Sequence, residues 1–322
     1  MTLSYIIPTY NPADDDLRRC LDSLTRQGLA RADYEVIVVD DGSAHSPEAV
    51  VQEFEGVMNI RLLRQPHARQ GAARNRGIEC ATGEYVRFVD SDDYLPPSSA
   101  SSLLELMASG ELDVLLFRFS TTEAVTAAAP RLNAVFPDGP AYMSRHTLFG
   151  SPCTLCFRRR LTDHPSPLRF AEHTFIEDEA FVTRLLWRAG RTGVTSAVGY
   201  IYVQHPASTT HLSDPDHTDE LFRAYFAALD DIRAFRQTQT EGAVGLERKI
   251  RYLSIDILRH ALRQRGGGEA RFDRCASALR QRDLFPLPRG RYSWKYNLFR
   301  ILSPHAFGRA LLRLAEHKKG II

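Results

Sequence analysis

No run of about 18 apolar residues occurs anywhere in the 322-residue chain, so the sequence predicts no membrane-spanning helix. The first residues lack the basic start and the small-residue cleavage site of a secretory signal. Cysteine is also scarce: five widely scattered residues are too few for a disulfide framework and favour a reducing compartment. Together these absences predict a cytoplasmic protein.

Two of the five cysteines, Cys153 and Cys156, form a C-x-x-C pair. No second cysteine pair or histidine pair lies at zinc-finger spacing from it. We therefore interpret both as buried thiols, with metal binding or redox chemistry as the alternative.

Two glycine-rich phosphate-binding patterns are missing as well. The chain has neither a G-x-G-x-x-G after its first predicted strand nor a G-x-x-x-x-G-K-[ST], which excludes the dinucleotide fingerprint and the P-loop. A phosphate ligand would then be bound by a metal ion and by arginines. Arg69, Arg74 and Arg76, around the start of a predicted helix, form either such an electropositive wall or an ordinary solvated helix face.

Net charge is small. With 41 Lys and Arg against 39 Asp and Glu, the formal charge of +2 predicts no strong general attraction to nucleic acid or membrane. The distribution is uneven, however. Residues 271–322 contain 12 basic and 3 acidic residues and carry +9, which leaves −7 on residues 1–270. The sequence therefore predicts an acidic body with a basic tail.

The first 120 residues alternate short apolar runs with amphipathic helical patterns, which is typical of βαβ units and an α/β fold with a parallel sheet. Residues 121–140 are rich in Ala, Pro and Thr and predict a loop or insertion, and beyond residue 215 the pattern is helical. The predicted strands are 4–8, 34–39, 60–63, 85–89, 114–119 and 197–203, and the predicted helices are one starting at 14–16 and those over 47–54, 71–80, 98–107 and 175–190.

Acid-rich turns follow two of the predicted strands. Asp40 and Asp41 end the second strand, and Asp90 and Asp92 follow the fourth. Ligands bind such sheets at the carboxyl ends of the strands. In an extended segment the alternate residues Asp90 and Asp92 would point the same way and share one Mg²⁺ or Mn²⁺, completed by phosphate oxygens. One such turn alone more often caps a helix, but two at one sheet edge favour a nucleoside diphosphate site.

Five segments together resemble glycosyltransferase family 2: IPTYN (7–11), VVDDGS (38–43), GAARNRG (71–77), GEYVRFVDSDD (83–93) and EDEAF (177–181). The resemblance is dense over residues 1–110, thinner to about residue 210 and absent beyond. It implies the GT-A fold, a Rossmann-like mixed sheet flanked by helices. The implied domains are a catalytic domain over 1–210, with nucleotide-sugar binding in 1–110 and the acceptor side in 111–210, and a helical C-terminal region over 211–322.

The resemblance also implies an activity. Relatives of this kind are inverting enzymes that move a hexosyl or N-acetylhexosaminyl group from a UDP-sugar to a hydroxyl of a glycan or lipid-linked saccharide. Their setting is bacterial surface polysaccharide or glycolipid assembly. The sequence does not indicate which sugar is donated, and it predicts no nucleic-acid partner.

The resemblance assigns a base pocket to the first two strand ends. By this match Pro8, Thr9 and Tyr10 flank a uracil, with Tyr10 able to stack on it. One of Asp40 and Asp41 would accept a hydrogen bond from the base N3, which favours uracil over cytosine because only uracil has a donor there.

A second set of matches concerns the diphosphate. Arg74 and Asn75 match the family's Arg-Asn pair near the nucleotide. Asp90, Ser91 and Asp92 match its D-x-D motif, in which the first Asp approaches the ribose and the last binds Mn²⁺ or Mg²⁺. Asp92 is accordingly the first choice of metal ligand, with Asp90 as the second.

A third set concerns catalysis. The pair Glu177 and Asp178 matches the family's acidic motif, in which the Asp is the general base that takes the acceptor proton. Acids at a helix start can also be simple partners of the helix dipole. His205 could reach the diphosphate or the metal, although a lone histidine is more often structural. Where relatives carry Lys-Leu, this chain has Leu155 and Cys156, so a phosphate contact from that lysine is not expected.

The basic tail, residues 290–322, interleaves Trp, Phe and Leu with Arg and Lys. This pattern fits an interfacial helix on an anionic membrane, which would place the protein on the inner face of the bacterial membrane. Packing on the body or on a second subunit, as in a homodimer, is the alternative.

Two other functions remain open at this point. The chain could be an inactive scaffold that binds a sugar nucleotide, although the D-x-D and Glu-Asp motifs are intact. It could also be a sugar nucleotidyltransferase. Those enzymes usually have a glycine-rich basic loop after the first strand, whereas residues 8–12 contain neither glycine nor a basic residue.

Overall fold

The structure is a computed structural model that describes residues 2–122, 130–204, 215–239, 243–264, 268–290 and 292–318. The chain divides into two compact units. The sheet unit comprises residues 1–142 and 149–208, and the helical unit comprises residues 143–148 and 209–322. The division between residues 208 and 209 lies two residues from the boundary expected at 210, and the short segment 143–148 joins the second unit.

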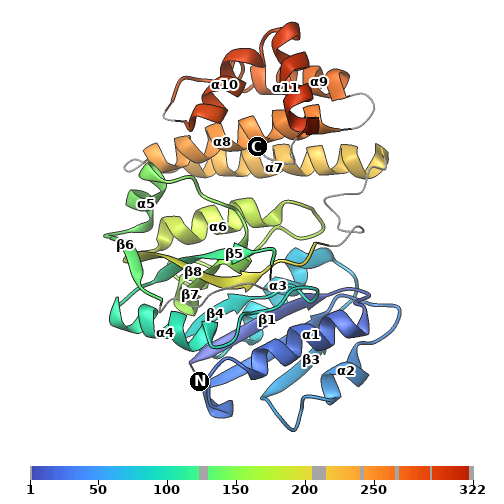
Figure 1. Ribbon diagram of the computed structural model, residues 1–322, viewed down its shortest axis with the longest axis vertical. Helices are drawn as coiled ribbons and strands as arrows, with labels where there is room; N and C mark the ends of the chain where they lie inside the picture. The colour runs from blue at the N-terminus through green and yellow to red at the C-terminus, as the bar shows by residue number, and fades with distance from the viewer. Residues whose placement is uncertain are drawn as a thin grey trace. The chain divides into compact units, whose positions relative to one another are not determined.

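Within the described part of the chain, the sheet unit is built on one eight-stranded mixed sheet in the order β3-β2-β1-β4-β7-β5-β8-β6 (Figure 1). β1 pairs in parallel with β2 and β4, and β2 with β3, whereas β7 runs antiparallel to both β4 and β5. β8 is parallel to β5 and antiparallel to β6. The strands are β1 (Leu3–Thr9), β2 (Tyr34–Asp40), β3 (Ile60–Arg64), β4 (Tyr85–Phe88), β5 (Val114–Ser120), β6 (Leu132–Phe136), β7 (Leu155–Arg158) and β8 (Thr192–Ile201).

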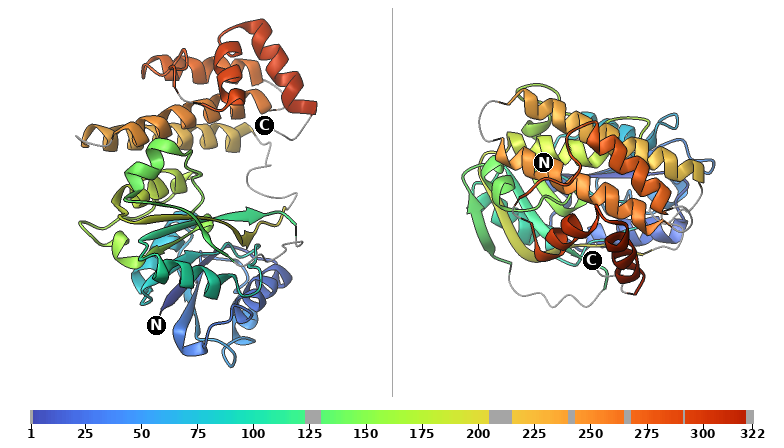
Figure 2. Two further views of the ribbon diagram at one scale, coloured as in Figure 1. Left: turned by 60° about the vertical axis from the view of Figure 1, so that its left-hand side comes forward. Right: turned by 90° about the horizontal axis from the view of Figure 1, so that it is seen from above.

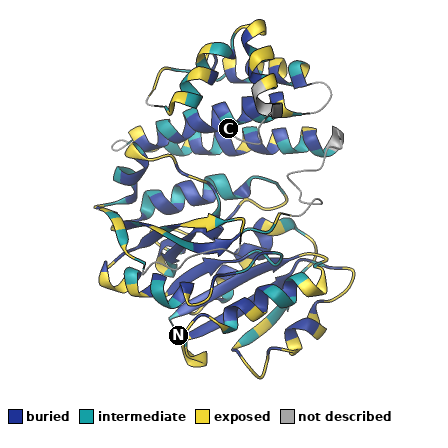
Figure 3. Cartoon of the chain, in the orientation of Figure 1, coloured by how far each residue is buried: buried dark blue, intermediate teal, exposed yellow. Residues whose placement is uncertain are grey.

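Strands β1, β2 and β4 are buried along their whole length (Figure 3). On one face of the sheet, Phe181 packs edge-on against Phe88 and Phe157, and Gly77 lies against Ile6. The helices of the sheet unit are α1 (Asp14–Thr25), α2 (Glu48–Gln52), α3 (Arg69–Cys80), α4 (Ser99–Ser109) and α6 (Glu177–Arg188), and α5 (Gly139–Arg145) crosses the division between residues 142 and 143. Helices α3 and α6 therefore cover that face, which brings their first turns to the carboxyl end of the parallel strands.

The opposite face carries the alternate residues of the same strands. The guanidinium of Arg87 is fully buried there, over the ring of Phe117, and donates to the Gly199 carbonyl at 2.7 Å. Leu103 of α4 packs beside Phe117 at Gly199, where there is no room for a Cβ. Helix α4 therefore covers this face at β5 and β8.

The helical unit contains α7 (Pro215–Gln237), α8 (Val244–Arg263), α9 (Gly268–Arg280), α10 (Trp294–Leu302) and α11 (Ala306–Lys318) (Figures 1 and 2). Helix α8 is the centre of this unit, since it contacts the other four helices. Its residues Leu253, Ile257 and Leu258 are buried, as are Phe299 of α10 and Leu312 of α11. None of the described helices is long and apolar enough to cross a membrane.

The predicted strands and helices of the first 120 residues are confirmed within one or two residues at most ends, as is the mixed α/β fold with C-terminal helices. The prediction of a loop over 121–140 is wrong at residues 132–136, which form β6. This short strand lies at the sheet edge with only one residue buried, and it directly follows the Ala-, Pro- and Thr-rich stretch that predicted a loop. The strand predicted over 197–203 begins instead at Thr192, in a polar stretch with a glycine.

Candidate functional site

An exposed aromatic pair marks the end of β1. The ring of Tyr10 lies over that of His67, with 4.2 Å between the centroids and an angle of 32°. Tyr10 is 52% exposed, whereas Pro8 and Thr9 are buried inside β1. Of the three residues expected to flank a base, Tyr10 therefore presents its ring to solvent, and the Thr9 carbonyl instead accepts from Asp41 N at 2.9 Å.

Asp41 lies beside this aromatic pair and is almost wholly buried. Its Oδ1 accepts hydrogen bonds from Gln65 Nε2 at 2.8 Å and Ala68 N at 3.0 Å, and its Oδ2 lies 2.9 Å from Nδ1 of His67. The adjacent Gly42 has a φ of +79°, and a Cβ there would lie 2.8 Å from the His67 amide. Glycine is therefore required for the turn that brings Asp41 against the segment before α3.

Asp40 has a different role in the same turn. Its Oδ1 accepts a hydrogen bond from Ser43 N at 2.9 Å, and Nε of Arg64 lies 3.4 Å from Oδ2. Asp40 thus holds the turn closed, and Asp41 is the carboxylate of the two that lies next to Tyr10 and His67.

Arg74 connects two acidic segments. Its Nη1 donates to Glu177 Oε1 at 2.8 Å and its Nη2 donates to Asp90 Oδ1 at 3.0 Å. Burial opposes the charged form of Arg74, but the charges of Asp90 and Glu177 outweigh it and raise the pKa of the guanidinium. Burial raises the pKa of Glu177, and the charge of Arg74 acts against that rise. The cation expected to face a diphosphate is thus held by two carboxylates.

Asn75 holds the segment that precedes α6. Its Nδ2 donates to the Phe170 carbonyl at 3.0 Å and to Glu172 Oε1 at 2.9 Å, and its Oδ1 accepts from Phe170 N at 2.8 Å. At Gly71 a Cβ would lie 2.3 Å from the carbonyl oxygen of Ala171, so α3 needs glycine to approach this segment. Asn75 therefore positions the start of α6 against α3.

The D-x-D segment is a turn. Asp93 N donates to the Asp90 carbonyl at 3.1 Å, so the expectation of an extended segment from Asp90 to Asp92 is wrong. The turn arises because Asp93 is drawn inward to buried partners. Asp90 Oδ1 also accepts from Gln70 Nε2 at 2.8 Å, while Ser91 and Asp92 are half-exposed. Strand alternation therefore does not align the two expected metal ligands.

The donor set of this turn fits a hard cation. No cluster of three or more His, Cys, Asp or Glu side chains suited to a metal is found among the described residues. Magnesium and manganese sites at substrate phosphates typically use only one or two carboxylates, and Asp90 and Asp92 supply that number. His205, the further expected ligand, lies outside the described residues.

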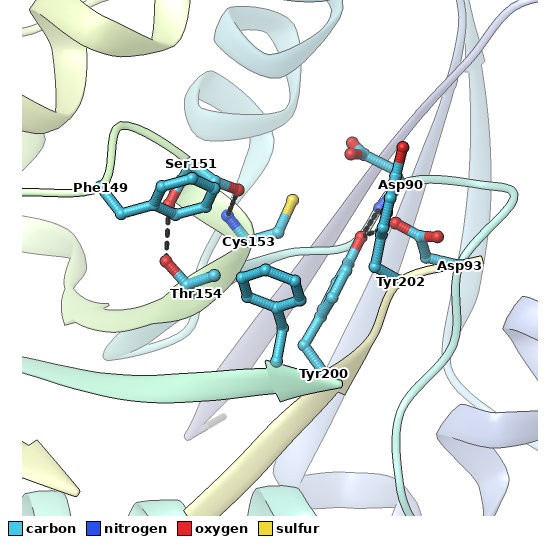
Figure 4. Close-up of a pocket in the computed structure, with 9 residues that line it drawn as sticks. Asp90, Asp93, Phe149, Ser151, Cys153, Thr154, Tyr200 and Tyr202 are labelled. Atoms are coloured by element: carbon cyan, nitrogen blue, oxygen red, sulfur yellow. Dashed lines mark hydrogen bonds between the residues drawn. The ribbon is translucent and has the colours of Figure 1, made fainter. Parts of the chain in front are cut away.

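Sequence reasoning missed a buried pair next to this turn. The Tyr200 hydroxyl donates to Asp93 Oδ2 at 2.5 Å and accepts from Asp90 N at 3.2 Å (Figure 4). Val203 N also donates to Asp93 Oδ1 at 2.7 Å. Burial, followed by the charge of Asp90, raises the pKa of Asp93 to about 8. Asp93 was visible as the third acid of its run, but nothing in the sequence links it to a tyrosine 107 residues away.

A cavity of about 290 Å³ opens beside the turn (Figure 4). Its lining residues come from the turn after β4, the end of β5, the 3₁₀ turn η2 (Pro152–Thr154) with the segment before it, and the end of β8. Burial raises the pKa of the Cys153 thiol well above its ordinary value and that of Cys156 to about 12, and both thiols are free, as interpreted from the sequence. The lining residues are Asp90, Asp93, Phe119, Phe149, Ser151, Cys153, Thr154, Tyr200 and Tyr202.

Glu177 and Asp178 occupy the first turn of α6. Ile176, just before the helix, has a left-handed backbone with φ 59°, which turns the chain sharply into the helix. Glu177 is 7% exposed and faces Arg74, whereas Asp178 is half-exposed. Of the two acids, Asp178 is the one that a substrate can reach.

Comparison with known proteins identifies relatives of this chain. A family profile described as "Glycosyl transferase family 2" matches residues 4–164, half of the chain. The uncharacterized glycosyltransferase YibD of Escherichia coli is 42% identical over 113 residues, 35% of this chain and 32% of YibD. A poly(ribitol-phosphate) beta-glucosyltransferase of Bacillus spizizenii is 28% identical over 264 residues, 81% of this chain. The chain spans 40% of that relative's length.

Two solved structures share the fold. TarS 1–349 of Staphylococcus aureus in complex with UDP-GlcNAc matches with a TM-score of 0.59 and 19% identity, over 87% of this chain and 92% of TarS 1–349. The mannosyltransferase PcManGT of Pyrobaculum calidifontis in complex with GDP-Man and Mn²⁺ matches with a TM-score of 0.57 and 16% identity, over 97% of this chain and 86% of PcManGT.

Proposed function

Since the chain belongs to glycosyl transferase family 2, we propose that it is an inverting enzyme that transfers a sugar from a UDP-sugar to an acceptor hydroxyl. The acceptor would be a glycan or lipid-linked saccharide of surface polysaccharide or glycolipid assembly. One observation carries the proposal: Arg74 joins the Asp90 turn to the start of α6, so the expected diphosphate end and the expected base are parts of one site.

Tyr10 and Asp41 are the proposed base pocket. The exposed Tyr10 ring can stack on a uracil, and Oδ2 of the buried Asp41 beside it can accept from the base N3. Asp40 instead closes the turn with Ser43. The complex of TarS with UDP-GlcNAc supports a uridine donor, whereas PcManGT binds GDP-Man.

Asp92 and Asp90 are the proposed ligands of a Mn²⁺ or Mg²⁺ ion. The ion would neutralise the charge of the diphosphate leaving group. The PcManGT complex with Mn²⁺ supports a metal on this fold. The role of Arg74 is to hold Asp90 in place through its hydrogen bond to Oδ1.

Asp178 is the proposed general base. In a single in-line displacement, an oxygen of the acceptor hydroxyl bonds to the anomeric carbon while the bond from that carbon to the diphosphate oxygen breaks. The proton of the hydroxyl passes to the Asp178 carboxylate. Glu177 supports this step indirectly, because its buried ion pair with Arg74 fixes the first turn of α6 and with it the position of Asp178.

The experiment compares Asp92→Asn and Asp178→Asn in transfer assays with UDP-sugars and Mn²⁺. Asp178→Asn should lower transfer about 100-fold or more while the affinity for UDP stays unchanged, because the base acts only on the acceptor. Asp92→Asn should weaken the response to Mn²⁺ as well. Asp22→Asn, at an exposed surface pair on α1, is the matched control. Transfer at the wild-type rate in Asp178→Asn would rule out the assigned base.

A donor panel tests the uracil pocket. Thermal unfolding with UDP-, GDP- and dTDP-sugars and Mn²⁺ should show the largest stabilisation by a UDP-sugar. Preference for a GDP-sugar would contradict the role given to Asp41.

Two further assays test the alternative functions. Slow hydrolysis of a UDP-sugar without acceptor would indicate an active transferase and exclude an inactive scaffold. Formation of a sugar nucleotide with release of diphosphate would instead indicate a nucleotidyltransferase.

The tail is the proposed contact with an anionic membrane. Helix α10 exposes Trp294, Leu298 and Ile301, and α11 exposes Phe307, Leu311 and Leu314. Both sets follow the spacing i, i+4, i+7, so each helix presents one apolar stripe. These six make up half of the exposed large apolar side chains in the described part of the chain. Together with the +9 charge of residues 271–322, they suit peripheral attachment at the inner face of the membrane.

Sedimentation with vesicles tests this contact. The full chain should sediment with vesicles that contain anionic lipid, and the triple variant Leu298→Ser, Phe307→Ser, Leu311→Ser should stay in the supernatant. Val57→Ser, at an exposed position of the sheet unit, is the control. If the triple variant sediments like wild type but changes a homodimer into a monomer, the stripes bind a second subunit and not a membrane.

A further inference from the structure

Two phenylalanines form an exposed stacked pair at the cavity beside the Asp90 turn. The rings of Phe119 and Phe149 lie nearly parallel, with 5.7 Å between the centroids and an angle of 20°. They are 41% and 58% exposed, an unusual degree for phenylalanine. The ring of Tyr202 meets that of Phe119 edge-on at 6.5 Å, and all three residues line the cavity.

The position of Phe119 results from an irregularity in the sheet. The register between β5 and β8 shifts between Leu116 and Arg118, and again between Arg118 and Phe119. Such bulges re-aim side chains and are common next to active sites. Phe117, inside the irregular stretch, is buried against Arg87, and Phe119, at its end, is exposed at the cavity. The hydrogen bond from Tyr202 N to the Ser120 carbonyl, at 2.8 Å, holds the two strand ends together beyond this stretch.

The rest of the cavity wall is mainly apolar, with a few polar groups among its lining residues. It includes the hydroxyl groups of Ser151 and Thr154 and the carboxyl groups of Asp90 and Asp93 (Figure 4). A sugar ring has matching surfaces: apolar C–H faces that pack on aromatic rings, and a rim of hydroxyls that hydrogen-bond to polar groups. We propose that Phe119 and Phe149, with Tyr202 at their edge, form a platform on which the acceptor sugar ring stacks.

The order of the strands separates this platform from the nucleotide end. Tyr10 and Asp41 lie at the ends of β1 and β2, Asp90 follows the neighbouring β4, and Phe119 lies in β5, with β7 between. A donor whose uracil is at Tyr10 and whose diphosphate is at Asp90 would place its own sugar beside Asp90. The next ring along the sheet, over the Phe119–Phe149 pair, is then the acceptor. This assignment rests on the proposed UDP-sugar transfer.

Saturation-transfer NMR on the full chain with UDP and Mn²⁺ tests the platform. The probes are methyl glycosides of glucose, galactose, mannose and N-acetylglucosamine, with saturation of the aromatic protons of the protein. Wild type should transfer saturation to the ring C–H protons of at least one probe. Phe119→Leu and Phe149→Leu should each reduce that transfer about fivefold, because leucine keeps the bulk but removes the flat ring. Val57→Leu, at an exposed position of the sheet unit away from the cavity, should leave it unchanged.

The affinities for UDP and for UDP-sugars, measured by calorimetry on the same variants, separate the possible outcomes. Unchanged affinities together with lost glycoside signals support the acceptor platform. If the variants lose affinity for the UDP-sugar but not for UDP, the rings bind the donor sugar and the acceptor platform is contradicted. Glycoside signals equal to wild type in both variants would also contradict the platform. Absence of UDP binding in wild type would contradict the proposed function. Calorimetry detects this outcome independently of the glycoside signals.

Discussion

Arg74 and Glu177, 103 residues apart in the chain, form a buried ion pair with 2.8 Å between Nη1 and Oε1. Both side chains are less than a tenth exposed, so neither charge is solvated by bulk water. The pair joins the second turn of α3 to the first turn of α6, and the second arm of Arg74 reaches Asp90. Removal of either partner should therefore disturb stability and the site together.

Arg74→Met should lower the free energy of unfolding by about 3 kcal/mol or more, because it leaves the carboxylates of Glu177 and Asp90 without their buried cation. Glu177→Gln should cost less, since Arg74 keeps Asp90 as a partner. Urea unfolding of both variants and of the double variant measures the coupling between the two sites. Additive losses would show that the pair contributes no coupling energy.

The buried carboxyl group of Glu35 should make the stability of the fold depend on pH. Burial opposes its ionised form, but hydrogen bonds from Ser4 and Thr82, and then the charge of Arg61, outweigh burial and lower the pKa of Glu35. Because the folded pKa lies below that of the unfolded chain, the carboxylate stabilises the fold above about pH 4.3. This stabilisation is lost as the pH falls through the folded pKa.

Glu35→Gln should therefore lower stability by about 1–2 kcal/mol at pH 7, with the difference from wild type shrinking below about pH 4. Urea unfolding at pH 3.5, 5 and 7 follows this change. Glu53→Gln removes an exposed partner of Arg18 and serves as the control, for which little change is expected at any pH. A difference for Glu35→Gln that stays constant across this range would contradict the assigned pKa shift.

Gly77 lies where helix α3 packs closely against strand β1, so a larger side chain there should destabilise the fold. An alanine Cβ at this position would lie 2.2 Å from Cγ2 of Ile6, where α3 crosses β1. Gly77→Ala should therefore cost about 1–3 kcal/mol by overpacking, despite the better helix propensity of alanine. Gly56→Ala is the matched control, since nothing lies within 4 Å of its Cβ, and it should be neutral or stabilise by up to about 1 kcal/mol. Equal effects in thermal unfolding would contradict close packing of α3 on β1.

Parts of this fold could be predicted because the signals were local. The strands at 4–8 and 34–39 are mostly apolar runs in a sheet covered on both faces, and each is followed by a polar segment that marks the ligand edge. Strand β6 was not recognised, because its five residues at the sheet edge follow an Ala-, Pro- and Thr-rich stretch that is typical of a loop. The alternation expected of Asp90 and Asp92 was wrong, since the segment turns and Asp93 bonds to Tyr200, a residue far away in the sequence.

The cavity had no local signal at all. Phe119 and Phe149 are 30 residues apart, on either side of an edge strand and a helix, and Phe119 lies at a shift in the register between β5 and β8. Nor does any spacing link Arg74 to Glu177. Sequence motifs therefore predicted which residue types belong to the site, whereas contacts between distant segments determine which of them support the others. Asn75 illustrates this difference, because a motif residue expected near the nucleotide instead holds Phe170.

Tyr10 predicts how strongly the nucleotide base is bound. One face of its ring packs on His67, and the ring as a whole is half-exposed. Because His67 already restricts the Tyr10 side chain, stacking of a uracil on the ring would cost little further side-chain entropy. Tyr10→Ala should raise the Kd for UDP about tenfold, the magnitude expected for one base–aromatic stack. Tyr10→Phe should bind UDP like wild type, since stacking does not need the hydroxyl. Isothermal titration calorimetry with UDP measures both, and an alanine variant with wild-type affinity would place the base away from Tyr10.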